Sequence, residues 1–295
     1  MQMLTEFAQM VISGIAIGCI YGVVALGFVL IYKASEVVNF AQGDLMMLGA
    51  FLGYTLIGII GLPFLVGVPL AVAGMAGIGA LLDRVVLRPM VGQPTFAIVI
   101  VTLGVGFVIR SVVSGIPGWG TETYSFESPF SKGVAKLGAL TVSHEHLAII
   151  AATIALIAVL YLFFRFTNLG IAMQATSQNQ LAAYYVGIPV KTILSMIWAI
   201  SAATAALVGI LLAPIAFVHV NMGFIGLKAF PAAVLGGFGS IPGAVAGGLI
   251  IGIVESLSGF YLPEGFKDVA AYVVLLMVLI FRPQGLFAEA TEKRV

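Results

Sequence analysis

Residues 7–32 read FAQMVISGIAIGCIYGVVALGFVLIY, an apolar run that opens after Glu6 and closes at Lys33. A helix needs about 20 apolar residues to cross a bilayer, so this run is long enough. It is too long and too often interrupted by glycine to be the core of a signal peptide, and no basic region precedes it. We therefore expect a retained membrane-spanning helix.

The composition of the whole chain points the same way. Of its 295 residues, 61% are hydrophobic and only 8% are charged, and the mean hydropathy is +1.16. A soluble domain carries roughly 25% charged residues. This composition excludes a typical soluble enzyme, a nucleic-acid-binding protein and a disordered protein, and the net charge of +1 recruits no charged partner. The single cysteine, Cys19, forms neither an intrachain disulfide nor a cysteine metal cage.

Further apolar stretches follow the first run, and their continuity favours helices over the strands of a barrel. They cover residues 46–60, 62–82, 94–113, 147–165, 192–213 and 268–281. We expect an all-α polytopic membrane protein with about eight transmembrane helices, forming a single permease domain over residues 1–295.

One apolar piece, 228–258, is cut by Pro231, Pro242 and many glycines. Its length is too short to cross a ~30 Å core twice at about 1.5 Å per residue. It is therefore expected to form two short helices or a re-entrant hairpin that turns near Gly239–Gly243. Such a segment either lines a transport path or packs as a tilted pair inside the bundle. A second interrupted segment, 36–50, lies in the first half of the chain, as in transporters with paired broken helices.

Orientation follows from the basic residues in short loops. Loop 83–93, loop 165–191 and the C-terminal tail each carry basic residues and are predicted to be cytoplasmic. Segment 114–146 is long and polar without a basic excess, and is predicted to be an external loop. Counting spans from these assignments puts the N-terminus outside and the C-terminus in the cytoplasm.

Residues 38–44 are polar within an apolar half of the chain. Asn39, Gln42 and Asp44 are costly in lipid, and a carboxylate in a span must be paired or solvated. Asp44 either faces a polar interior or caps the helix that begins at Leu45 near the inner surface.

Two further charged residues stand inside apolar stretches. Glu255 either meets solute or pairs with Lys228 or Lys267, and pairing is the favoured interpretation. Arg110 lies near the outer end of its span, where snorkelling to the headgroups is favoured over contact with a substrate.

Glycines recur at every fourth position, a spacing that lets helix backbones approach closely. This spacing either packs helices within one subunit or forms a seam with a second subunit. The residues concerned are Gly14, Gly18 and Gly22, and the pairs Gly243 with Gly247 and Gly248 with Gly252.

The stretch 168–189 is too polar to span the membrane. Asn168 is a candidate cap for a helix that begins near Gly170, and Gly187 with Pro189 is a typical end. One face of this helix is expected to carry residues with mostly small side chains, namely Ala172, Ala175, Asn179, Ala182 and Val186. Such a face suits docking into a groove of a partner. The alternative, a helix lying on the headgroups, is weakened by the absence of Lys and Arg from the polar face.

No pattern in the chain predicts catalysis. His144-Glu145-His146 lacks the four-residue spacing of a helical zinc site and is expected to lie in a solvated loop. The chain has no phosphate-binding loop and no nucleophile motif, so active transport needs a gradient or a separate ATPase.

The chain resembles the membrane permeases of the bacterial branched-chain amino-acid ABC importers. The resemblance runs over nearly the whole length, and its ordered motifs are specific. They are GCIYGVVALG at 18–27, VNFAQGD at 38–44, MLGA at 47–50, RPM at 88–90, the stretch 170–188, KAF at 228–230, LGGFGSIPGA at 235–244 and FRPQGLF at 281–287.

The resemblance implies an inner-membrane importer made of several subunits. Its partners are a second homologous permease, two cytoplasmic ABC ATPases that use ATP, and a periplasmic substrate-binding protein that delivers a small-molecule solute. The chain itself binds no cofactor, metal or nucleic acid. Related permeases of this class are thought to carry urea, short amides or other amino acids. A stand-alone channel, a gradient-driven carrier and a purely structural subunit are the alternatives from other classes.

The family's ATPase-coupling segment corresponds to 168–189. The matching residues are Gly170, Ala175, Asn179, Ala182 and Gly187, whereas Gln174 stands where a basic residue is common and Gln180 where charged residues are usual. The broken segments are expected to line the translocation path. The candidate path residues are Asn39, Gln42, Asp44, Gly239, Pro242 and Glu255.

Overall fold

The computed structural model describes residues 2–90, 92–130, 133–137, 140–263 and 265–287. The α-helices are α1 (Gln2–Ser35), α2 (Gln42–Gly53), α3 (Phe64–Leu82), α4 (Thr95–Gly115), α5 (His144–Phe166), α6 (Asn168–Gln178), α7 (Gln180–Tyr185), α8 (Val190–Ala216), α9 (Met222–Leu227), α10 (Ala229–Gly236), α11 (Ile241–Tyr261) and α12 (Phe266–Phe281). A π-helix, Tyr54–Ile59, continues α2, and a π-helix, Asp83–Leu87, and a 3₁₀-helix, Arg88–Met90, follow α3. Strands β1 (Val134–Leu137) and β2 (Leu140–Ser143) form an antiparallel hairpin.

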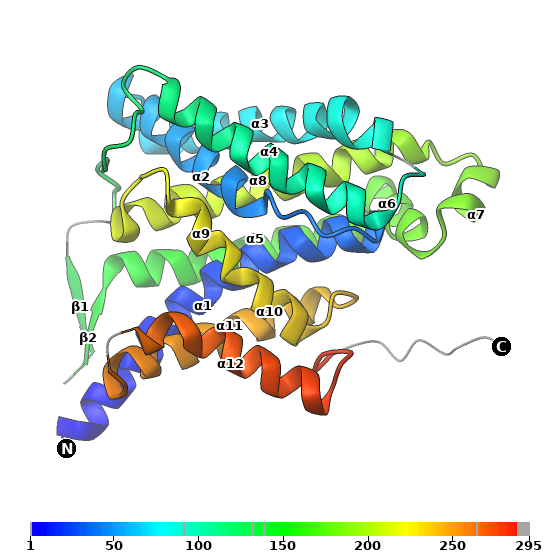
Figure 1. Ribbon diagram of the computed structural model, residues 1–295. Helices are drawn as coiled ribbons and strands as arrows, with labels where there is room; N and C mark the ends of the chain where they lie inside the picture. The colour runs from blue at the N-terminus through cyan, green and yellow to red at the C-terminus, as the bar shows by residue number, and fades with distance from the viewer. Residues whose placement is uncertain (1, 91, 131–132, 138–139, 264, 288–295) are drawn as a thin grey trace.

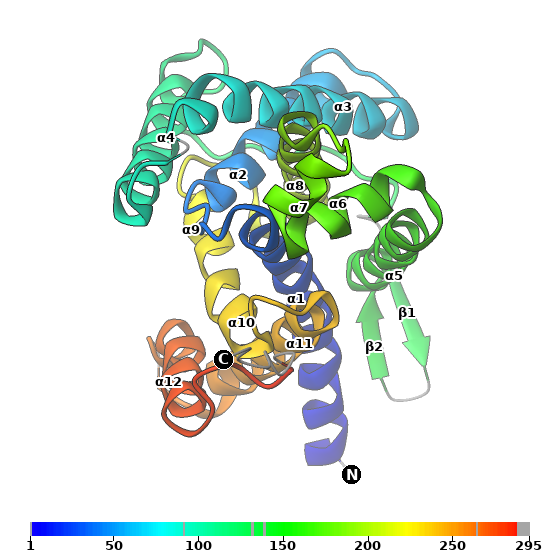
Figure 2. The same cartoon turned by 90° about the vertical axis from the view of Figure 1, so that its right-hand side faces the viewer.

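The long helices run back and forth between two ends of an elongated bundle (Figure 1). One end carries the β1–β2 hairpin and the start of α1. The other carries α6, α7 and the end of α12. Seen along the bundle, α3 and α4 lie on one side and α12 on the opposite side, with α9 and α10 between them (Figure 2).

Seven helical segments among the described residues are long and apolar enough to cross a membrane. They are Thr5–Ser35, Gln42–Ile59, Phe64–Met90, Thr95–Gly115, His144–Phe166, Val190–Ala216 and Ile241–Tyr261. The shorter apolar pair Met222–Gly236 adds a broken passage, and α12 runs alongside it to the far end. The all-α polytopic fold is confirmed, and the predicted count of about eight is a fair approximation.

The close approach of α1 and α11 explains the glycine spacing. These two helices form the most extensive contact between any two elements. A Cβ on Gly14 would lie 2.7 Å from Ile253 Cα, and a Cβ on Gly18 would lie 2.7 Å from Leu249 Cα. Lipid is as apolar as leucine, so helices in a membrane associate through tight packing more than through the hydrophobic effect. The glycines in α1 therefore pack helices within one subunit.

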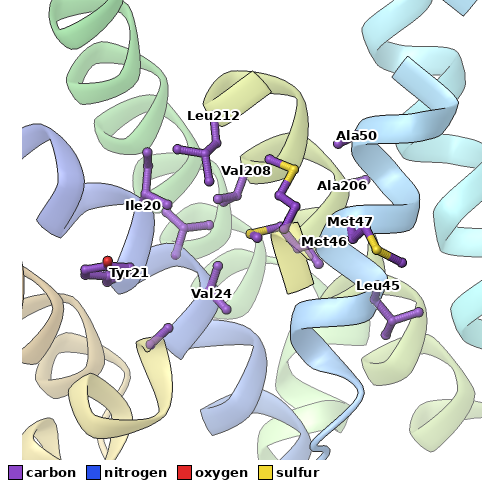
Figure 3. Packing of buried hydrophobic residues seen from close by; sticks show 14 of the residues in the cluster. Ile20, Tyr21, Val24, Leu45, Met46, Met47, Ala50, Ala206, Val208 and Leu212 are labelled. Carbon is purple, nitrogen blue, oxygen red and sulfur yellow. The ribbon is translucent and has the colours of Figure 1, made fainter. Parts of the chain in front are cut away.

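The centre of the bundle is formed by α1, α2 and α8. Figure 3 shows Ile20 and Val24 of α1, Met46 of α2 and Val208 of α8 gathered between these helices. These four side chains are almost completely buried. The broken segments, residues 36–41 and the α9–α10 pair, pack against this centre.

The predicted form of residues 228–258 is only partly correct. The chain does enter and return, and it turns at residues 237–240. However, the first arm begins earlier, at Met222, and is broken into α9 and α10 at Lys228, whereas the return arm α11 is a full-length helix of 21 residues. The apolar limits used for the prediction were too narrow at both ends, because His219, Asn221 and the polar end of α11 belong to the same passage.

Candidate functional site

The connection between α1 and α2, residues 36–41, is the first break in the bundle. The backbone leaves α1 at Glu36, whose φ of 55° is left-handed, and returns into the bundle before α2 begins (Figure 1). The Phe40 amide donates to Thr102 Oγ1 of α4 at 3.2 Å, and the Ala41 amide donates to Asn39 Oδ1 at 3.1 Å. Side chains thus satisfy backbone groups that have no helical partner, as irregular backbone within a membrane requires.

Gln42 fastens the start of α2 to the packed centre. Its Nε2 donates to the Ser201 carbonyl of α8 at 3.3 Å, and its Oε1 accepts from Asn39 Nδ2 at 3.3 Å. Ser201 Oγ lies 3.0 Å from Gln42 Oε1 and 3.1 Å from the carbonyl of Gly27. All these polar side chains are fully buried, so Asn39 and Gln42 hold the broken segment in place.

Asp44 and Arg110 form an ion pair inside the bundle. Arg110 Nε lies 2.6 Å from Asp44 Oδ1, with the Asp44 and Arg110 side chains 6% and 18% exposed. Arg110 is therefore paired rather than snorkelling, and that prediction was wrong. The capping interpretation of Asp44 was wrong as well, because the N-cap of α2 is Ala41 and Asp44 stands in the first turn. A charge taken out of water needs a partner, and each supplies the other.

Two glycines and a phenylalanine surround this ion pair. A Cβ on Gly223 of α9 would lie 2.5 Å from Asp44 Oδ1, and a Cβ on Gly106 of α4 would overlap Asp44 Oδ2. The ring centroid of Phe224 lies 4.1 Å from Arg110 Cζ, within the range of a cation–π interaction. The ion pair thus joins α2, α4 and α9 at a point where only glycine leaves room for the carboxylate.

Glu255 belongs to a second buried cluster. Tyr21 of α1 donates to Glu255 Oε2 at 2.5 Å, and Lys228 Nζ lies 3.1 Å from Glu255 Oε1. Lys228, at the break between α9 and α10, also lies 2.5 Å from Asp268 Oδ1 of α12. The predicted pairing of Glu255 with Lys228 is confirmed. The cluster connects α1, α11, α12 and the broken passage.

Gly239 and Pro242 lie at the end of the bundle, away from both ion-pair clusters. Gly239 belongs to the turn between α10 and α11, and Pro242 is in the first turn of α11. Ser240 caps α11 by accepting from the Gly243 amide at 3.0 Å. The structure therefore brings Asn39, Gln42 and Asp44 together, puts Glu255 in a separate cluster, and does not bring Gly239 or Pro242 to either.

The segment 282–287 folds back onto this same turn. The Leu286 amide donates to the Leu235 carbonyl at 2.8 Å. Gly285, with a φ of +88°, is so close that a Cβ would lie 2.7 Å from Gly237 Cα. The FRPQGLF motif at 281–287 is thus explained by packing against the end of α10.

The polar stretch at 168–189 forms two short helices instead of one. Thr167, and not the predicted Asn168, caps α6, because its Oγ1 accepts from the Gly170 amide at 3.0 Å. Asn179 breaks the helix with φ −160° and ψ 102°, and its Oδ1 accepts from the Ala182 amide at 2.9 Å to cap α7. An asparagine competes for backbone hydrogen bonds in this way, so the predicted continuous face does not form. Gly187, at φ +87°, ends the segment as predicted.

Helix α7 presents a largely exposed surface at this end of the bundle. Ala182 is exposed, and Tyr184 and Tyr185 are exposed by 67% and 77%. Contacts below anchor the segment: Gln180 Nε2 donates to the Ala34 carbonyl at 2.5 Å, and Gln174 Nε2 donates to the Phe164 carbonyl at 3.0 Å. Gly170 packs so closely on Phe163 and Phe164 that a larger side chain would overlap the α5 backbone.

A polar cluster lies beneath α7. Ser195 Oγ donates to the buried Asp83 Oδ2 at 2.5 Å, and Arg88 Nη2 lies 2.8 Å from Ser195 Oγ and 3.1 Å from the Lys191 carbonyl. Asp83, Arg88 and Lys191 line a cavity of about 780 Å³ between α7 and the start of α8. Arg88 Nη2 also lies 3.4 Å from Asp83 Oδ2. Nothing in the sequence pattern had singled out the Asp83–Ser195 contact, because these two residues are 112 positions apart in the chain.

His144 and His146 do not lie in a solvated loop, as had been expected, but begin α5. Ser143 caps this helix by accepting from the Glu145 amide at 3.2 Å. Within the part of the chain that the structure describes, no group of three or more His, Cys, Asp or Glu side chains is arranged to hold a metal ion.

A bundle of apolar helices with broken passages and buried ion pairs is typical of a polytopic membrane protein. The chain belongs to the family described as branched-chain amino acid transport system / permease component, which matches residues 10–281. It is a multi-pass membrane permease of that family, a transport subunit and not an enzyme.

Several relatives match almost end to end. The chain is 30% identical to the high-affinity branched-chain amino acid transport system permease protein LivH of Escherichia coli K12, over 98% of both chains. It is 28% identical to the corresponding protein BraD of Pseudomonas aeruginosa, again over 98% of both chains. A solved structure, PsaBC from Streptococcus pneumoniae in complex with Fab, has a similar fold, with a TM-score of 0.51 and 16% identity over 94% of this chain and 92% of that one.

Proposed function

We propose that this chain is the membrane permease subunit of an ATP-driven ABC importer for branched-chain amino acids in a bacterial inner membrane. The family and the near end-to-end similarity to LivH and BraD support the solute class. The observation that carries the proposal is the α6–α7 segment. Hydrogen bonds from Gln174 and Gln180 fasten it to the bundle, whereas much of the α7 surface is exposed. The chain hydrolyses no ATP itself and depends on partner ATPases.

The importer contains three kinds of partner. A second homologous permease completes the path, two cytoplasmic ABC ATPases bind beneath, and a periplasmic substrate-binding protein delivers the solute from above. The exposed surface of α7 supports the ATPase contact. Without Lys or Arg along α6 and α7, that contact is neutral and relies on shape and apolar surface.

The coupling segment is residues 168–189. Gly170 seats α6 on the end of α5, and Gly187 turns the chain back into α8. Asn179 sets the angle between α6 and α7, so Ala175 and Ala182 belong to different helices that move together. ATP binding draws the coupling segments of the two permeases together, and this shift requires that ATP bind the closed state more tightly.

The orientation follows from the distribution of charge between the two ends. Arg84, Arg88, Arg165, Lys191 and Arg282 all belong to turns or helix ends at the α6–α7 end. Basic residues in short loops mark the cytoplasmic side. That end is cytoplasmic, the C-terminus lies there, and the N-terminus and the external segment 114–146 lie outside.

The translocation path runs along the two broken passages. Residues 36–44 and the α9–α10 pair are the places where a span is interrupted inside the bundle, as in transporters whose binding sites lie at broken helices. Asp44 is a charged residue at the first break, and Glu255, through Lys228, holds the break between α9 and α10 in place. Asn39 and Gln42 hold the wall of the path, and Gly239 and Pro242 form the hinge at its cytoplasmic end.

The first experiment is purification of the chain in mild detergent, followed by mass spectrometry of what comes with it. We expect a second permease and ATPases, with the binding protein recovered when it is supplied with its solute. Titrating leucine, urea and short amides onto that binding protein then identifies the solute. Recovery of the chain alone as a homo-oligomer would contradict the importer proposal and favour a channel or carrier.

Coupling is tested by substituting Ala182→Trp on the exposed surface of α7. We expect the subunit to remain in the membrane while leucine uptake falls at least tenfold and ATP hydrolysis no longer responds to solute. The control is Ala151→Trp, because Ala151 is also exposed but lies toward the opposite end, on α5. Normal uptake and normal ATPase stimulation in Ala182→Trp would contradict the coupling assignment.

A further inference from the structure

The Arg110 guanidinium is held in place with only part of its hydrogen-bonding capacity in use. Its Nε donates to Asp44 Oδ1 at 2.6 Å. Among the residues that the structure describes, none accepts a hydrogen bond from either terminal nitrogen of Arg110. The side chain is 18% exposed, so those nitrogens are not sealed in the core. An arginine has five donors in a planar fork, and Asp44 accepts from only the one on Nε.

The surroundings make this fork a binding group. Arg110 Cζ lies 4.1 Å from the ring centroid of Phe224 and 5.9 Å from that of Phe107. Both rings contact the guanidinium without accepting a conventional hydrogen bond from its terminal nitrogens. Asp44 is enclosed by Gly106 and Gly223. It accepts a hydrogen bond from Nε of Arg110 and so fixes that side of the guanidinium. Terminal guanidinium nitrogens bind a carboxylate through two parallel hydrogen bonds, a geometry that lysine does not reproduce.

Arg110 is also suitably placed beside the proposed translocation path. Arg110 is on α4, whose buried residues Thr102, Gly106 and Val113 form one stripe against the neighbouring helices. Seen along the bundle, α9 lies between α4 and α12 (Figure 2). The contact of the guanidinium with Phe224 of α9 therefore puts Arg110 beside the broken passage.

We propose that Arg110 binds the carboxylate of the transported amino acid, and that Asp44 is a positioning residue that aims the guanidinium. The inference rests on the proposed function and deepens it by assigning the residue that selects for a carboxylate. A path for urea or a short amide has no need of a cation whose burial is costly. An amino acid brings the anion that makes this arginine useful.

The test measures equilibrium binding of radiolabelled leucine to the purified permease–ATPase complex in nanodiscs, without the binding protein. In the wild type, we expect leucine to compete at least tenfold better than leucinamide, which lacks the carboxylate, and urea not to compete. Arg110→Lys keeps the charge and the pairing to Asp44 but loses the fork. We expect it to weaken leucine binding about tenfold or more, and to leave leucinamide binding unchanged.

The matched control is Arg165→Lys, because Arg165 is also stacked on an aromatic ring but lies at the end of α5. It should bind leucine as the wild type does. Asp44→Asn with Arg110→Gln removes both charges at once, so that no unpaired charge is left to prevent folding. We expect this double variant to assemble with its ATPases and to lose leucine binding.

Wild-type leucine binding in Arg110→Lys or in the double variant would overturn the inference, as would equal competition by leucine and leucinamide in the wild type. In those cases the complex still assembles and hydrolyses ATP, so the importer proposal stands. If no ATPase accompanies the wild-type chain, the importer proposal itself fails. The two failures are thereby distinguished.

Discussion

Asp44 and Glu255 are two buried carboxylates of the same bundle, yet their surroundings differ. Glu255 uses both oxygens, one with Tyr21 at 2.5 Å and one with Lys228 at 3.1 Å, and Lys228 is shared with Asp268. Asp44 has one charged partner, Arg110, and is otherwise walled by glycine.

The difference indicates different tasks. In the Glu255 cluster, both carboxylate oxygens are hydrogen-bonded and the contacts extend across α1, α9–α10, α11 and α12, so the cluster ties four parts of the fold together. In the Asp44 pair, Arg110 has N–H donors that no described residue accepts from. The helix that carries Arg110, α4, has few buried residues. A saturated network stabilises a fold, whereas a pair with spare donors is able to bind something else.

The strongest test of this comparison is Lys228→Met. The substitution leaves the 3%-exposed Glu255 carboxylate without its cation. Removing one partner of a buried pair costs about 3–5 kcal/mol, so we expect most of the folded protein to be lost from the membrane. The control is Lys267→Met, since Lys267 is exposed on the neighbouring helix α12. Equal thermal stability of the two variants in detergent would show that the Glu255 cluster does not stabilise the fold.

Tyr21→Phe should have the next largest effect. It removes the hydroxyl that donates to Glu255 Oε2 but keeps the ring in the core. A hydrogen bond to a charged group contributes about 1.5–3 kcal/mol, so the melting temperature should fall while uptake per folded molecule stays unchanged. Tyr272→Phe, on an exposed tyrosine, serves as the control. Loss of uptake without loss of stability would mean that Tyr21 belongs to the transport machinery instead.

Gly223→Ala probes the other side of the comparison. A Cβ would lie 2.5 Å from Asp44 Oδ1, so the carboxylate or α9 must shift. Overpacking of this kind costs about 1–3 kcal/mol, and it also moves the group that aims Arg110. We expect uptake to fall more than membrane abundance does. In the control Gly77→Ala, no atom lies within 4 Å of the added Cβ, and uptake should be normal. Proportional losses of uptake and abundance in Gly223→Ala would place the Asp44 pair with the structural network.

The sequence was sufficient to predict what depends on local pattern. Apolar run lengths gave the helical fold, the glycine spacing gave a tight helix contact, and Gly187 gave a helix end. Snorkelling of Arg110 and capping by Asp44 were wrong, because the partnership of these two residues spans 66 positions and leaves no periodic trace. Asn179 was placed on a helix face because periodicity counts positions and ignores an asparagine's ability to cap. The length of 228–258 was underestimated because polar residues inside the passage ended the apolar count.

Asp268→Asn is the smallest and most discriminating change in the Glu255 cluster. Asp268 pairs with the same lysine as Glu255, yet its side chain is 70% exposed. An exposed ion pair is worth roughly 0–1 kcal/mol and weakens with salt. The buried partner retains its cation in this variant, so we expect a loss of stability well below that of Lys228→Met, and smaller still at high ionic strength. If Asp268→Asn destabilised the protein as much as Lys228→Met, the stabilisation would lie in the exposed half of the cluster. The hydrogen bonds of the buried Glu255 carboxylate would then no longer account for the contrast with Asp44.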